Sequence, residues 1–149
     1  GHLQKNKAKT AVQLFHLIHA VDSVELAEEL NRQAAKAEKV QRILVQVKLS
    51  GETTKHGADE KDLMNLLARI SKMHNLKPEG LMTMPPYFED MEKARPYFKK
   101  LRELRDGARQ SGFVLPELSM GMSHDFEAAI EEGSTMVRIG TALFGRRIL

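Results

Sequence analysis

Hydrophobic positions follow two periods that alternate along the chain. Residues 43–49 carry an apolar side chain at every second position, which is the pattern of a β-strand with one apolar face. Residues 63–73 carry apolar side chains at intervals of three and four, which is the pattern of one buried helix face. Strand-like and helix-like segments follow one another in this way over the whole chain. Such alternation is typical of a parallel α/β fold.

The same pattern predicts the approximate bounds of each element. The predicted strands span residues 15–21, 43–49, 80–84, 117–122 and 135–140. The predicted helices span residues 5–14, 24–37, 63–75, 94–110 and 125–132, with a polar loop at 51–57. Asp22 or Ser23 can cap the second helix. Pro85 and Pro86 should end the third strand, because a proline nitrogen cannot donate to a strand ladder.

Composition restricts the class of protein to one globular domain or most of one. Hydrophobic residues make up 42% of the 149 residues and charged residues 29%, which is ordinary for a globular chain. Disulfides and thiolate metal sites are excluded because there is no cysteine. The net charge of +3 comes from basic residues interspersed with acids, which favours solvated helix faces over a nucleic-acid surface. No apolar run approaches the ~20 residues that span a bilayer.

Candidate chemistry gathers in the last two predicted strands. If Val137 and Ile139 pack on helices, Arg138 points to the other face of its strand, into the interior, where its charge needs an acceptor. Gly140 and Thr141 then offer two backbone N–H groups and a hydroxyl at the strand end. Ser123 offers the same after the preceding strand, and phosphate sites of (β/α) barrels gather after the last two strands. This arrangement predicts a phosphate site beside a buried guanidinium.

Simpler interpretations of the same residues stay open. Gly140-Thr141 can be only a turn, and Arg138 can pair with a carboxylate at a strand end. Ser123 can cap the start of the short helix that follows, where free N–H groups also favour an anion. Ser123-His124-Asp125 is not a catalytic triad, because the side chains of three consecutive residues diverge.

Several motifs carry a family resemblance. The sequences SMGMSHD at 119–125, GSTMVRIGTALFG at 133–145 and GHLQKNK at 1–7 resemble the pyridoxal phosphate homeostasis protein family. Lys55-His56-Gly57 is similar to the Lys-x-Gly loop of that family, and residues 80–85 add weaker support. The resemblance covers essentially the whole chain.

The resemblance implies a fold. The family has a single-domain (β/α)8 TIM-type barrel that binds pyridoxal 5'-phosphate (PLP) and is related to the N-terminal domain of alanine racemase. Residues 1–7 resemble a motif that closes the third strand of that barrel. We therefore expect residues 1–149 to form a partial barrel domain that lacks about the first two strands, carries roughly the last two thirds, and leaves the Schiff-base lysine upstream.

The resemblance also implies a cofactor site and a function. Arg138 would meet the pyridine nitrogen of PLP, and the other expected cofactor contacts are Met122, Ser123, Gly140 and Thr141. The expected function is non-catalytic PLP homeostasis, meaning storage, buffering or delivery of the cofactor. A PLP-dependent amino-acid racemase is the alternative, because the Arg-x-Gly pattern serves racemases as well. A barrel for another phosphorylated metabolite is a third hypothesis.

Partners and location follow from the resemblance in the same way. The expected partners are PLP and PLP-dependent apoenzymes, with no nucleic acid and no membrane. The expected location is the cytoplasm, and the full-length protein is expected to be a monomer.

The remaining polar residues give weaker indications. Lys55 can be an exposed loop lysine or a basic group at the barrel mouth, and Lys48 can neutralise a phosphate or pair with an acid. His16 and His19 fall on opposite faces of a strand and no histidine or acidic cluster with metal-ligand spacing surrounds them, so no metal site is predicted in the chain. Four methionines lie in predicted strands and are expected to pack inside: Met82, Met84, Met120 and Met122.

Overall fold

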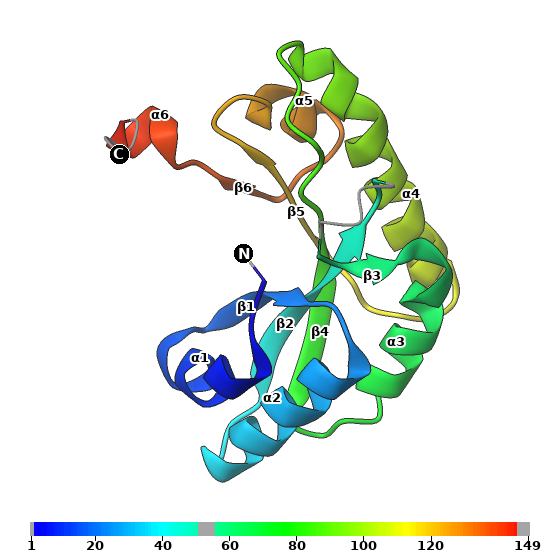
Figure 1. Ribbon diagram of the computed structural model, residues 1–149. Helices are drawn as coiled ribbons and strands as arrows, with labels where there is room; N and C mark the ends of the chain where they lie inside the picture. Colours follow the sequence, from blue (N-terminus) through cyan, green and yellow to red (C-terminus); the bar gives the residue numbers. More distant parts are fainter. Residues whose placement is uncertain (1, 51–55, 146–149) are drawn as a thin grey trace.

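The computed structural model of the chain describes residues 2–50 and 56–145. Within these residues a parallel sheet orders its strands β1-β2-β4-β5-β6, and a short strand β3 pairs with β2. The strands are β1 (Leu17–Val21), β2 (Gln41–Lys48), β3 (Ala58–Asp59), β4 (Leu76–Met82), β5 (Glu117–Met122) and β6 (Met136–Arg138). Figure 1 shows the strands as an open arc with helices along its outer side. The described chain is half of an α/β barrel, which confirms the predicted fold class.

Most of the helices connect successive strands and cover the convex side of the arc, whereas the last helix lies beyond one end of it (Figure 1). The α-helices are α1 (Ala8–Leu14), α2 (Val24–Lys36), α3 (Leu63–Ile70), α4 (Arg95–Gln110), α5 (Phe126–Glu131) and α6 (Thr141–Phe144). Short 3-10 turns precede three of them: η1 (Lys5–Lys7), η2 (Glu60–Asp62) and η3 (Met91–Ala94). Ser23 caps α2, because its hydroxyl accepts a hydrogen bond from the backbone N–H of Leu26.

The hydrophobic core lies between the sheet and these helices. Leu30 of α2 and Phe98 of α4 are completely buried, in a hydrophobic cluster that also contains strand residues such as Ile43. The inner face of β2 is buried as well, since Leu44 and Gln46 are both inaccessible to solvent. Burial on both faces is typical of the central strands of a parallel sheet.

Strand β4 is the element that the sequence pattern places least well. It begins at Leu76, four residues before the predicted start, and includes Pro78. The sheet tolerates the missing N–H of this proline because the register between β2 and β4 shifts at this point, after the pairing of Ile43 with Pro78. The strand ends at Met82, before Pro85. Strand β3 is not predicted at all, because two residues carry no readable period.

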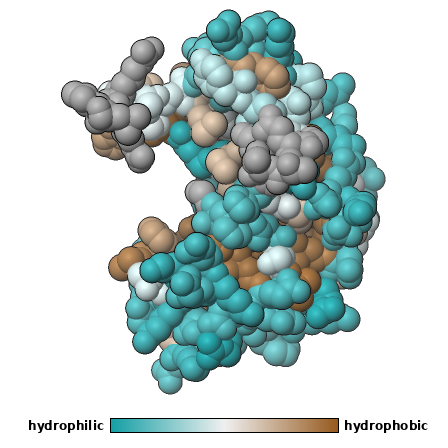
Figure 2. Space-filling model, viewed as in Figure 1, coloured by the Kyte–Doolittle hydropathy of each residue, from teal (hydrophilic) through white to brown (hydrophobic). Residues whose placement is uncertain are grey.

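The arc does not close, and a gap separates its two ends. Figure 2 shows the molecule hollowed there, between the segment that ends in α6 and the part that contains α1. In the described ranges, no helix combines the length and the apolar character that crossing a bilayer requires.

Candidate functional site

Arg138 ends strand β6, and its side chain reaches the two strands that precede β6 in the sheet. Its Nη1 donates a hydrogen bond to the hydroxyl of Ser119 on β5 at 2.7 Å. Its Nη2 donates to the carbonyl oxygen of Thr83, just after β4, at 2.9 Å. Burial lowers the pKa of the guanidinium below its usual range. Arg138 therefore points inward as predicted, and among the described residues its partners are a hydroxyl and a carbonyl rather than a carboxylate.

Ser119 links Arg138 to His19 of strand β1. The serine side chain is completely buried, and its Oγ lies 2.9 Å from Nδ1 of His19. A guanidinium can only donate, so Ser119 Oγ accepts from Arg138 and its own proton goes to His19 Nδ1. This assigns the His19 proton to Nε2. Burial, and after it the positive charge of Arg138, lowers the pKa of His19 below its usual range.

Ser119 and His19 belong to the site although the sequence pattern does not predict them there. The sequence indicates only that His19 is not a metal ligand and that Ser119 is part of a motif. The available signal is that each is a polar residue with an apolar residue on either side of it in a predicted strand. A polar residue in that position needs a partner, but the sheet register decides which one.

Replacing Ser119 with alanine should destabilise the fold. The change leaves a buried guanidinium N–H and the Nδ1 of His19 without a partner, at a cost of about 1–3 kcal/mol in the free energy of unfolding. Urea denaturation measures this loss. Ser71→Ala is the matched control, because the Ser71 hydroxyl is exposed and contacts only the carbonyl of Ala68, and it should cost less than about 0.5 kcal/mol. Equal losses in the two variants would show that the Ser119 hydroxyl does not hold this network together.

A group of backbone donors lies after β6. The N–H groups of Gly140 and Ala142 both donate to Oγ of Ser123, at 3.0 and 3.2 Å. Thr141 stands between them as the first residue of α6, with an exposed side chain. The structure thus brings Ser123 to Gly140 and Thr141, as the sequence predicted. Two N–H groups that converge on one oxygen are also the arrangement that binds a phosphate oxygen.

One expectation about Ser123 is wrong. Helix α5 begins at Phe126, so Ser123 lies in the preceding turn and does not cap it. The carboxylate of Asp125 accepts the N–H of Met122 instead, at 2.7 Å. This local hydrogen bond holds the turn and leaves the Ser123 hydroxyl free to face the segment after β6.

An apolar pocket of about 250 Å³ adjoins Arg138. It draws residues from both ends of the arc: from α1 and β1 on one side and from β6 on the other. Its lining is Leu3, Ala11, Phe15, Leu17, Ile18, His19, Ala20, Met82, Met84 and Arg138. Apolar walls with a small number of fixed polar groups are typical of small-molecule sites.

The other predicted positions have mixed outcomes. Lys48 pairs with Asp59 at 3.1 Å, which decides between its two interpretations in favour of the acid. Lys55 lies outside the described residues. Met82 and Met120 are buried as expected, and Met84 lines the apolar pocket. Met122 is 37% exposed, so its expected interior packing is wrong. It ends β5, where no further strand residue covers it.

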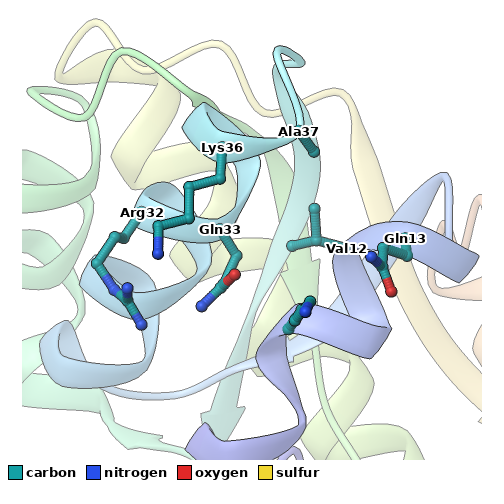
Figure 3. A pocket seen from close by; sticks show the side chains of 7 residues that line it. Val12, Gln13, Arg32, Gln33, Lys36 and Ala37 are labelled. Carbon is teal, nitrogen blue, oxygen red and sulfur yellow. The ribbon is translucent and has the colours of Figure 1, made fainter.

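A second, basic groove lies apart from these residues, between α1 and α2 (Figure 3). It encloses about 370 Å³ and contains none of the predicted site residues; its lining is Lys9, Val12, Gln13, Arg32, Gln33, Lys36 and Ala37. Arg32 is held by the carboxylate of Glu29 at 2.6 Å, so part of the positive charge is neutralised.

Comparison with known proteins gives a consistent result. The family model of the alanine racemase N-terminal domain matches residues 1–147. The pyridoxal phosphate homeostasis protein of Aquifex aeolicus is 51% identical over 148 residues, covering 99% of this chain and 65% of that protein. Its namesake from Synechocystis is 40% identical and covers 99% of this chain and 68% of the relative.

A solved structure shows the same fold. PipY from Synechococcus elongatus, solved with PLP bound, has a TM-score of 0.90 at 38% identity, over 97% of this chain and 68% of PipY. The chain thus spans about two thirds of the length of the relatives that it matches.

Proposed function

Because the chain belongs to the alanine racemase N-terminal domain family, and within it to the pyridoxal phosphate homeostasis proteins, we propose that it binds PLP for storage, buffering or delivery. The observation that carries the proposal is the half-buried guanidinium of Arg138, which lines an apolar pocket and is held by Ser119 and Thr83. Met122, Ser123, Gly140 and Thr141 are the other proposed cofactor contacts.

The residues present suit each part of PLP. The apolar pocket, with Met82 and Met84 in its wall, suits an aromatic ring. The N–H groups of Gly140 and Ala142 donate hydrogen bonds to Ser123 Oγ in this structure. A phosphate oxygen in the place of that hydroxyl would accept the same two hydrogen bonds. Arg138 has five N–H donors, of which two are used, so three remain for the pyridine nitrogen.

Arg138 also supports a role in holding PLP rather than in catalysis. Bound PLP supplies an electron sink for carbanion chemistry, and that sink is strongest when the ring nitrogen is protonated. A guanidinium keeps its proton even when burial lowers its pKa, so it can only donate to the ring nitrogen. The nitrogen then stays unprotonated and the sink is weak. Because the Arg-x-Gly pattern also serves racemases, the proposal that the protein is not an enzyme rests in addition on its relatives, which are named pyridoxal phosphate homeostasis proteins.

The proposal extends to the domain, the location and the partners of the protein. Residues 1–149 would form one partial barrel domain, and the lysine that bonds to PLP would lie in the part of the protein that precedes them. The protein would act in the cytoplasm as a monomer at full length, and PLP-dependent apoenzymes would receive the cofactor.

Equilibrium dialysis with PLP and with pyridoxal tests the proposed function. PLP should bind at least about tenfold more tightly than pyridoxal, because charge-assisted hydrogen bonds to the phosphate contribute about 1.5–3 kcal/mol each. Thr141→Val keeps the shape of the side chain and removes the hydroxyl. It should weaken PLP binding by about 2–10-fold and leave pyridoxal binding unchanged. Equal affinity of the parent chain for both ligands would refute the phosphate site.

An assay of amino-acid turnover tests the non-catalytic part. With PLP bound, the chain should racemise or decarboxylate amino acids no faster than free PLP does. Faster turnover, removed by Arg138→Ala, would favour the racemase alternative.

A further inference from the structure

Two histidines and an aspartate meet at a place that the PLP site does not use. Nδ1 of His2 lies 3.1 Å from Oδ2 of Asp22, and the rings of His2 and His56 stack with their centroids 4.0 Å apart. One ligand atom from each of the three residues lies within 4.8 Å of the other two. Asp22 directly follows β1, and His56 belongs to the segment between β2 and β3. Residues 20 and 34 positions apart therefore converge at the carboxyl ends of neighbouring strands.

We propose that His2, Asp22 and His56 bind a divalent transition-metal ion of the zinc type. Two imidazole nitrogens and a carboxylate oxygen are the donor set of many open zinc sites, which keep a fourth position for water. Calcium and magnesium prefer sites made entirely of oxygen, so the two imidazoles disfavour them.

The distances suit such an ion. Ligand atoms ~2.1 Å from a tetrahedral ion lie about 3.4 Å from one another. The His2–Asp22 separation of 3.1 Å is already close to this value. His2 and His56 are exposed side chains, so their rotation can bring in the third ligand without moving the core. On binding, the ion takes the place of the proton between His2 Nδ1 and Asp22, and the ring of His2 carries its proton on Nε2 instead.

The surroundings of the cluster also favour a cation. Asp22 lines a cavity of about 310 Å³ that holds three further carboxylates, Glu25, Asp59 and Asp62, against one ammonium, that of Lys48.

A buried side chain anchors His56. Gln46 on β2 is inaccessible to solvent, and its amide donates to the backbone carbonyl of His56 at 2.9 Å. The backbone of this ligand is therefore held by the sheet, while its ring stays free to turn toward the ion.

Calorimetry with ZnCl2 tests the site, on the chain without a polyhistidine tag and without PLP. The parent should bind one Zn²⁺ per chain. His2→Ala and His56→Ala should each weaken binding at least about tenfold, since removal even of a residue that only orients a ligand costs 10–100-fold. His74→Ala, which removes an exposed histidine outside the cluster, should bind like the parent.

Cobalt absorption and thermal melting make the test independent of folding defects. Co²⁺ should give strong visible bands in the parent and lose them in His56→Ala, while the melting temperatures of the metal-free proteins stay equal. The absence of stoichiometric Zn²⁺ binding, or equal affinity in the parent and in both histidine variants, would overturn the proposal.

Discussion

Replacing Gly80 with alanine is expected to prevent the sheet from forming in its present register. Gly80 lies in β4 and pairs with Leu44 of β2 on one side and Glu117 of β5 on the other. A Cβ at this position would lie 2.0 Å from the carbonyl oxygen of Glu117 and 2.7 Å from its carbonyl carbon. Both atoms belong to the backbone of a neighbouring strand, so relief requires β4 and β5 to move apart. The expected loss is at least about 4 kcal/mol, within the range of the most damaging single substitutions.

Gly107→Ala is the matched control for Gly80→Ala. Gly107 lies within α4, and a Cβ added there meets no atom within 4 Å. Alanine is the better helix former by about 1 kcal/mol, so this variant should be more stable than the parent. Thermal and urea unfolding of the two variants measures both effects. A Gly80→Ala protein that unfolds within about 1 kcal/mol of the parent would show that the β4–β5 spacing is not as tight as the structure places it.

Arg138→Ala should reduce PLP affinity by about 10–100-fold. The change removes the donors proposed for the pyridine nitrogen, and a hydrogen bond from a charged group contributes about 1.5–3 kcal/mol. Because this contact is to the ring, pyridoxal binding should fall by the same factor. This pattern differs from that of Thr141→Val, which is expected to affect PLP only.

Two further variants separate the role of Arg138 from general charge. Arg138→Lys keeps the positive charge but loses the planar donors, so it should restore only part of the affinity. Arg32→Ala removes an arginine from the groove between α1 and α2 (Figure 3) and should bind PLP like the parent. If Arg138→Ala bound PLP as the parent does while Arg32→Ala did not, the cofactor site would lie in that groove.

Elements with a strong period could be predicted from the sequence. Strand β5 has the predicted bounds, and α4 begins one residue from its predicted start, because each combines a clear period with a stop signal. Strand β4 begins four residues before its predicted start, because Pro78 reads as a break and the register shift beside it, which leaves Glu79 of β4 without a partner on β2, has no local signal. Propensity is local, whereas pairing is decided by the neighbouring strand.

For the candidate site, too, the sequence predicts the direction of a side chain along its own strand but not its partners on other strands. Alternation along β6 places Arg138 inward, and the end of that strand lies beside Ser123 as predicted. The partners Ser119, His19 and Thr83 come from three other parts of the sheet, so their meeting depends on the full register. The contact between His2 and His56 depends on the path of a loop, which no period encodes.

The contact between Arg138 and the cofactor is tested most directly by 15N NMR of ring-labelled PLP bound to this chain. If Arg138 donates to the pyridine nitrogen, that nitrogen is unprotonated at neutral pH, and Arg138→Ala shifts its resonance. A pyridinium resonance in the parent chain, or a resonance that Arg138→Ala leaves in place, would contradict the proposed site.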